Sequence, residues 1–137
     1  MIETMPTRIP MSFTLPLKMP SMNNFPRHGA KGVWAYRKIK GMYLRAVAPL
    51  AAAFHARERR HLRIDRILGP GEYAYEELEG ACKPLVDALK RHGYLVNDSP
   101  RWCSREYHQE ERGPQPAVRI TLTATEPYVP PSRRRRG

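Results

Sequence analysis

A strongly basic chain gathers many of its acids into one short stretch. The formal net charge is +11, with 24 Lys and Arg against 13 Asp and Glu. Yet the segment from residue 72 to residue 98 holds Glu72, Glu76, Glu77, Glu79, Asp87 and Asp98. Glu77 and Glu79 are two positions apart, and in an extended segment this spacing points both carboxylates to the same side. These two acids can therefore converge on one cation.

Lys83 and Asp87 follow Glu79 in steps of four residues, so on a helix the three side chains project from one face. Such spacing is also that of ordinary surface salt bridges, worth about 0.3 to 0.5 kcal/mol, and alone does not indicate a site. Asp98 makes the difference, because a helix followed by a short return brings this carboxylate back beside the start of the helix. The sequence therefore predicts a pocket that contains Glu77, Glu79, Asp98 and Lys83.

Such a pocket suits Mg²⁺, which is commonly held by one or two carboxylates together with a substrate phosphate. In phosphodiester hydrolysis this ion generates the hydroxide nucleophile and stabilises the leaving oxygen. We expect Lys83 to offset charge on the scissile phosphate or to orient the attacking water. An isoelectric point near 10.2 favours a nucleic-acid partner for the rest of the surface. The basic surface would gather DNA, and the acidic pocket would hold the cation that cuts it.

The elements that must position these residues begin with a strand in "SFTLPL" (12–17), whose apolar residues alternate. Residues 20–32, rich in proline, glycine and cations, are predicted to form an extended loop. A helix follows from Trp34, with an apolar stripe at Ile39, Tyr43, Val47, Leu50 and Phe54, and should kink or end near Pro49. "RRHLRIDRIL" (59–68) then predicts a strand that Arg66 interrupts.

A second helix carries Leu78, Cys82, Leu85 and Leu89 at helical spacing. Pro84 sets its start near 79–81, because proline is tolerated where its missing donor would not have bonded. Gly93 suits the left-handed turn after the last residue of a helix. "RWCSREYH" and "AVRITLT" complete the chain as strands, the latter with Val118, Ile120 and Leu122 inward.

This order of elements predicts one small domain of mixed α/β (α+β) class, with a mixed sheet of about four strands and two main helices. We expect an N-terminal tail at 1–11, the domain at 12–126, and a Pro/Arg-rich tail at 127–137 that includes an arginine run at 133–136. No apolar run is long enough to cross a bilayer and no signal-peptide core is visible, so we expect a cytoplasmic protein.

Neither cysteine belongs to a CxxC pair, so neither a disulfide nor a zinc site is expected, and Cys82 should be a buried thiol. No small organic cofactor is indicated. For phosphate contacts we select Arg27, Lys31, Arg37, Lys38 and Arg105. Tyr73 and Tyr75, just before the acids, are candidates for stacking on a distorted base near the cut.

The run "ELEGACKPLVDALKRHGYLVND" resembles the central pattern of the RusA family of Holliday-junction resolvases, D-x-D-N-x-x-K-P-x-x-D-A-L followed by a glycine turn and a D-D pair. The matching residues are Lys83, Pro84, Asp87, Ala88, Leu89, Gly93 and Asp98. "LPLKMPSMNN" also looks like the family's P-P-S-x-N strand end, with Pro20, Ser21 and the pair of asparagines that ends at Asn24.

The resemblance implies a homodimer of α/β subunits, from a bacterial, phage or prophage setting, that acts in DNA recombination and repair. It implies binding of four-way DNA junctions and symmetric nicking of two strands with Mg²⁺, for which Mn²⁺ is a possible substitute. It also implies metal ligation by Glu77, Glu79 and Asp98, with Lys83 as a catalytic cation and Asn24 at the DNA-binding strand end. Asp87 matches too, although a helix-supporting role suits it as well.

The chain departs from the family pattern at four positions. Glu77 and Glu79 replace aspartates, Gly80 replaces an asparagine, and Asn97 replaces the first acid of the terminal pair. A glutamate adds one methylene, and a displacement of about 1 Å at a reacting centre can cost roughly a hundredfold in rate. Because both changes keep an acid, we expect metal binding to be retained.

Three other functions fit part of the sequence. A noncatalytic protein that binds junctions or duplex DNA would keep the fold without cleavage. A basic protein that coats RNA would explain the charge but not the acidic pocket, and the chain lacks the aromatic sheet motif of common single-strand readers. A basic protein without any polyanion partner is the simplest alternative.

Overall fold

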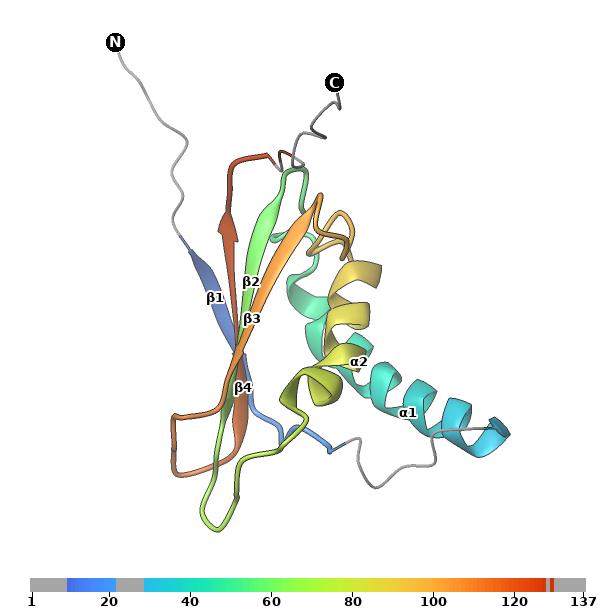
Figure 1. The fold of residues 1–137 in the computed structure, drawn as a ribbon, viewed down its shortest axis with the longest axis vertical. Coiled ribbons are helices and arrows are strands. Elements are labelled where there is room, and N and C mark those ends of the chain that lie inside the picture. Colours follow the sequence, from blue (N-terminus) through green and yellow to red (C-terminus); the bar gives the residue numbers. More distant parts are fainter. Residues whose placement is uncertain (1–9, 22–28, 128, 130–137) are drawn as a thin grey trace, which may run out of the picture.

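The computed structural model describes residues 10–21, 29–127 and 129 (Figure 1). Its elements are β1 (Met11–Leu15), α1 (Gly29–Val47), the short 3-10 helix η1 (Ala48–Leu50), β2 (Arg60–Ile67), α2 (Leu78–Arg91), β3 (Cys103–His108) and β4 (Ala117–Ala124). This is the predicted order of strands and helices. The arginine run at 133–136 lies outside the described residues.

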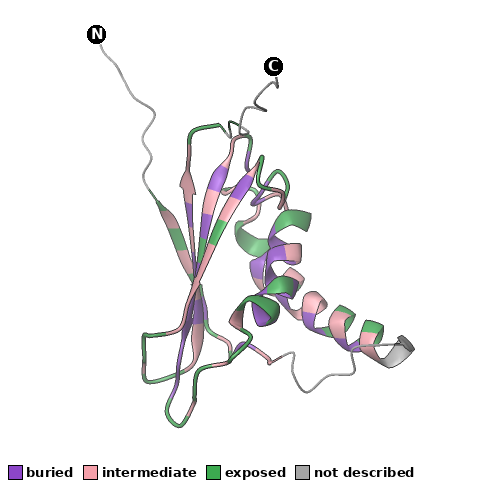
Figure 2. Ribbon diagram, viewed as in Figure 1, coloured by how far each residue is buried: buried purple, intermediate pink, exposed green. Residues whose placement is uncertain are grey.

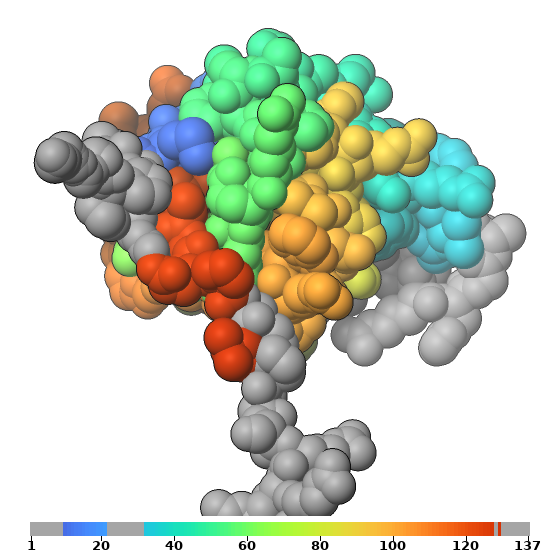
Figure 3. Space-filling view, turned by 90° about the horizontal axis from the view of Figure 1, so that it is seen from above, coloured from blue at the N-terminus to red at the C-terminus, as the bar shows by residue number. Residues whose placement is uncertain are grey.

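The four strands form one mixed sheet in the order β1-β4-β2-β3. Strands β2 and β3 are parallel, whereas β4 is antiparallel to both β1 and β2. Helices α1 and α2 lie on the same side of this sheet (Figure 1), and Figure 3 shows α1 in cyan on the side of the molecule opposite β1. The chain is therefore a single small α+β domain, as expected, and the homodimer stays a prediction.

Helix α2 is the crossover that parallel pairing of β2 and β3 requires, because two parallel neighbours cannot be joined by a tight turn. After α2 the chain reverses at Gly93, whose positive φ of 86° is the left-handed conformation predicted for it. The Tyr94 N–H then donates to the Leu89 carbonyl, which closes the end of the helix. The chain then stays beside the last turn of α2, where Asp98 lies 3.6 Å from Lys90, until β3 begins.

The core lies between the sheet and the two helices (Figure 2). Val118, Ile120 and Leu122 of β4 are fully buried there, and the alternate residues of β4 are partly exposed, as the alternation predicts. On α2, Cys82, Leu85 and Leu89 are also fully buried, so Cys82 is the buried thiol that was expected. Burial raises its pKa to about 12, and in the structure it is a free cysteine.

Helix α1 differs from its prediction at its start. It begins at Gly29, so Gly29, Lys31 and Gly32 are helical rather than part of an extended loop. A helical glycine costs roughly 1 kcal/mol relative to alanine, and packing of α1 against α2 offsets this cost. The end is as predicted, because α1 stops at Val47 and Pro49 lies in η1. The apolar stripe also stops there, since Leu50 is exposed.

Helix α2 begins one residue before the predicted range and passes through Pro84. Pro84 cannot donate to the carbonyl of Gly80, so the helix lacks one of its bonds at that point. The helix continues because Pro84 and its neighbours Leu85 and Val86 are buried in the core. Among the described helices, none is long and apolar enough to span a bilayer.

Candidate functional site

A pocket of about 340 Å³ lies along α2. It is lined by Glu77, Glu79, Gly80, Lys83, Val86, Asp87, Asp98, Arg105 and Tyr107. These residues come from the end of the β2–α2 loop, the outward side of α2, the return after α2, and β3. The structure therefore brings the predicted Glu77, Glu79, Lys83 and Asp98 to one pocket.

The start of α2 positions the two glutamates. Glu77 occupies the N-cap position and Glu79 lies in the first turn, and both side chains are exposed. Carboxylates near a helix N-terminus are favoured by the partial positive charge of the unpaired N–H groups there. The two acids therefore lie at the N-terminus of α2, where negative charge is most favourable.

Asp98 reaches the pocket from the return after α2. Its carboxylate lies 3.6 Å from the Lys90 ammonium, which belongs to the last turn of α2. The prediction that Asp98 returns beside the start of the helix is therefore wrong, because the chain turns at Gly93 and stays at the C-terminal end of α2. Its backbone N–H donates to the Asn97 side-chain oxygen at 2.7 Å. Asn97, which stands where the family pattern has an acid, therefore helps to order the backbone at Asp98.

Asp87 is fixed by helix α1. The Tyr36 hydroxyl donates a hydrogen bond to the Asp87 carboxylate, in a partly buried setting. Burial and this hydrogen bond raise the pKa of Tyr36 above its ordinary value, so the hydroxyl keeps its proton at neutral pH. Asp87 therefore both lines the pocket and ties α2 to α1.

Two cations balance the acids. Lys83 projects from α2, and Arg105 projects from β3, where it is an exposed residue. Tyr107, two residues after Arg105, shares its side of the strand. Burial raises the Tyr107 pKa to about 12, so its hydroxyl is a neutral hydrogen-bond donor in the pocket. The pocket therefore offers acids for a cation, and cations with a hydroxyl for a phosphate.

The donor chemistry of the pocket suits Mg²⁺, because its acids supply only oxygen ligands. Among the described residues, no three acidic, histidine or cysteine side chains are arranged to hold a metal together. Mg²⁺ does not require such a cage, since one or two carboxylates with waters and a phosphate commonly suffice. The residues present fit this ion as an open site completed by substrate.

The residues selected for DNA contact have different positions. Arg37 and Lys38 are exposed on α1, and the Lys38 ammonium lies 5.1 Å from the ring centre of the exposed Trp34. Arg105 lies in the pocket. Asn24 and Arg27 lie outside the described residues, and so does the side chain of Lys31, whose backbone is in the first turn of α1.

Tyr75 is not placed as expected for a stacking residue. Its hydroxyl donates to the Met19 carbonyl at 2.6 Å, and the Arg66 guanidinium covers its ring at 3.5 Å from the ring centre. One ring face and the hydroxyl are therefore occupied within the protein. Tyr73, two residues earlier, has 80% of its surface exposed.

Sequence reasoning missed Tyr107 and Tyr36. The period of two in a strand could have found Tyr107 once Arg105 was selected. Tyr36 carried no local signal, because its partner Asp87 is 51 residues away in the sequence. No protein-family model and no curated protein matches this chain.

Proposed function

We propose that this protein is a Mg²⁺-dependent, structure-selective endonuclease that resolves Holliday junctions or other branched DNA, in the manner of the RusA-like resolvases its central motif resembles. The observation that carries the proposal is the pocket along α2, which Glu77 and Glu79 line at the start of the helix and Asp98 lines from beside its last turn, together with Lys83 and Arg105. The chain around this pocket is basic overall, which suits a polyanionic substrate.

Each pocket residue has a role in this proposal. Glu77 and Glu79 would hold Mg²⁺ together with the substrate phosphate, and Asp98 would become a third ligand once released from Lys90. The ion, when bound, would supply activation of the attacking water and charge neutralisation at the leaving oxygen. Lys83 and Arg105 bind the scissile phosphate and stabilise the charge that develops on it. Asp87 accepts a hydrogen bond from Tyr36 and thereby holds α2, with its pocket residues, against α1. Because a four-way junction needs two symmetric incisions, the active form in this proposal is a homodimer.

The test is cleavage of a synthetic four-way junction by the purified protein. We expect nicking with Mg²⁺ or Mn²⁺ and none with a chelator. Glu79→Gln and Asp98→Asn should each reduce the nicking rate by about a hundredfold or more, because each removes a charge from the pocket. Glu76→Gln is the matched control, since Glu76 is exposed on the same loop but does not line the pocket.

Retention of full nicking by both pocket variants would assign the chemistry to other residues. A wild-type protein that binds junctions but does not cleave them with any divalent ion would support the second candidate, a noncatalytic branched-DNA-binding protein. Two features favour this candidate: described side chains form no three-ligand metal group, and Asp98 is already paired with Lys90. Competition among a junction, a linear duplex and an RNA hairpin separates both candidates from an RNA-coating protein.

A further inference from the structure

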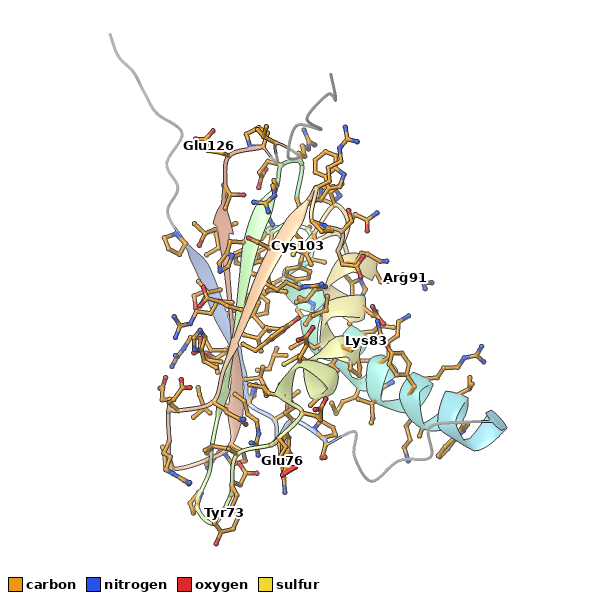
Figure 4. The ribbon with its side chains drawn as sticks, in the orientation of Figure 1. Tyr73, Glu76, Lys83, Arg91, Cys103 and Glu126 are labelled. Carbon is orange, nitrogen blue, oxygen red and sulfur yellow. The ribbon has the colours of Figure 1, made fainter. Side chains whose placement is uncertain are left out.

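The loop between β2 and α2, residues 68–77, presents an exposed aromatic ring on a tightly held backbone. Tyr73 is 80% exposed. In Figure 4 it projects from the tip of this loop at one end of the molecule, with Glu76 between it and α2. An aromatic side chain this exposed gains nothing from the core, so its ring is free for contact with another molecule.

A buried arginine fixes the backbone at the tip. Arg66 is only 2% exposed, and its guanidinium donates both to the Tyr73 carbonyl and to the Gln109 side-chain oxygen at 3.0 Å. Gln109 in turn accepts from the Tyr75 N–H at 2.9 Å and donates to the Tyr75 carbonyl at 2.7 Å. The backbone at Tyr73 and Tyr75 is therefore fixed by Arg66 of β2 and by Gln109, which follows β3.

The beginning of the loop is fixed as well. The Glu72 carboxylate accepts from the Gly69 N–H at 2.8 Å and lies 3.6 Å from the Lys18 ammonium. The turn between Gly69 and Glu72 uses Gly71, whose φ of 78° is accessible to glycine without strain. Since the backbone is already ordered, contact through Tyr73 would cost little further conformational entropy.

The charges of the loop indicate which part of DNA this ring would meet. Residues 68–77 contain no Lys or Arg, and Glu76 is exposed there, so the loop does not attract phosphate. The face of a base is uncharged and stacks on aromatic side chains without sequence preference. Tyr73 is four residues from Glu77, which limits their separation to about 14 Å, or about four base steps.

We propose that Tyr73 stacks on a base at the branch point and thereby selects branched over linear DNA. This inference rests on the proposed function. Base stacking is interrupted where the arms of a junction meet, so a base face is accessible there, whereas a linear duplex keeps its bases stacked. Tyr73 would act as a specificity residue beside the pocket, and would take no part in the chemistry.

Junction and duplex affinities of the wild type, Tyr73→Ala and Tyr73→Phe, measured with a chelator present to prevent cleavage, test this proposal. We expect Tyr73→Ala to bind the junction about 5- to 100-fold more weakly, as removal of one aromatic stack predicts, and to bind the duplex within twofold of the wild type. Tyr73→Phe keeps the ring and should match the wild type. All three proteins should unfold at the same temperature, because the side chain is exposed.

Photocross-linking gives a second readout. With 5-iodouracil next to the branch point, we expect a cross-link to residue 73 in the wild type and Tyr73→Phe, and none in Tyr73→Ala. The proposal is overturned by unchanged junction affinity in Tyr73→Ala, or by a Tyr73→Phe variant as weak as Tyr73→Ala. It is also overturned if Tyr73→Ala instead abolishes self-association in sedimentation, since Tyr73 would then contact a second copy.

Failure of the proposed function is measured separately, on the wild type alone. A wild-type protein that neither prefers the junction over the duplex nor nicks it would overturn both proposals. A wild type that nicks the junction, with Tyr73 variants that behave identically to it, overturns only the role of Tyr73.

Discussion

At the scale of single residues, Asp87 is the pocket residue for which a structural role can be tested apart from a catalytic one. It matches the motif that resembles the resolvases, and it also accepts a hydrogen bond from Tyr36 of α1. A hydrogen bond to a charged group contributes about 1.5 to 3 kcal/mol to stability. We therefore expect Asp87 to contribute mainly to the stability of the fold.

We predict that Tyr36→Phe lowers the free energy of unfolding by about 1 to 2 kcal/mol, because the partly buried Asp87 carboxylate loses its donor. Asp87→Asn should have an effect of similar size. The double variant should lose less than the sum of the two, as expected for two residues in direct contact. Urea unfolding of the four proteins measures this, and strict additivity would show that the two side chains do not interact in solution.

Glu106 gives a prediction about pH. Its two carboxylate oxygens accept hydrogen bonds from His61 at 2.5 Å and His108 at 2.6 Å. These bonds, led by that from His108, lower the Glu106 pKa from 4.5 to about 2. A lowered pKa in the folded state adds stability above the ordinary pKa, and this stability is lost as the pH falls toward 2.

Between pH 4.5 and pH 2, the wild type should therefore lose stability more steeply than Glu106→Gln, which cannot ionise. Arg63, at 4.0 Å from Glu106, and Glu110, at 3.5 Å from His108, also face this group and are unchanged in the comparison. Denaturant unfolding at pH 6, 4 and 3 measures the difference. If the free energy of unfolding fell by the same amount in both proteins between pH 6 and pH 3, the lowered pKa of Glu106 would be contradicted.

Residue spacing was sufficient to select Glu77, Glu79 and Lys83, because the period of a strand and the period of a helix determine which side chains share a face. Asp98 was selected from an expected return to the start of α2, and it lines the pocket from beside the last turn instead. The same reasoning could not separate Tyr73 from Tyr75. Their difference depends on Arg66 and Gln109, which lie on β2 and just after β3, and a local pattern contains no information about such distant partners.

At the scale of elements, the turn after α2 and the middle of α1 offer a matched pair of glycines. Gly93 has a positive φ, and an added Cβ would lie 2.9 Å from the His55 ring. Gly41 is helical, and an added Cβ would meet only the far end of Arg45, at 3.6 Å. The same substitution should thus have opposite effects at the two positions.

We predict that Gly93→Ala lowers the free energy of unfolding by about 1 to 2 kcal/mol, since an L-residue is strained in the left-handed region. Gly41→Ala should raise it by about 0.5 to 1 kcal/mol, because alanine loses less entropy in a helix. Thermal and urea unfolding of both variants checks the signs. A stabilising Gly93→Ala would show that the turn after α2 differs from the one described.

Strong periodic patterns predicted the strands and helices correctly. The predicted starts of the helices were wrong because they relied on the small local energy costs of glycine and proline. The alternation at Val118, Ile120 and Leu122 identified β4, because a strand with one buried face must alternate. The start of α1 was missed because Gly29 and Gly32 indicated a break, whereas helix packing outweighs a cost of about 1 kcal/mol each. Pro84 was tolerated inside α2 for the same reason.

At the scale of the whole molecule, charge is distributed unevenly along the chain. Residues 4–57 contain no Asp or Glu, so α1 carries only cations among its charged residues. The acids are concentrated in the second half, at the pocket and on the sheet face that no described helix covers. On that face Arg63 and Arg119 are paired with Asp65 and Glu111, whereas Arg37 and Lys38 are exposed on α1.

This distribution predicts which cations contact DNA. If α1 follows the phosphate backbone, Arg37→Gln with Lys38→Gln should reduce the slope of log affinity against log salt by about 2, because each phosphate that is no longer neutralised accounts for roughly 0.9. Arg63→Gln with Arg119→Gln removes the same charge from the sheet face and should leave the slope unchanged. Titrations of junction binding between about 50 and 200 mM salt measure both variants. An equal decrease of slope in both would mean that net charge, rather than the surface of α1, governs binding.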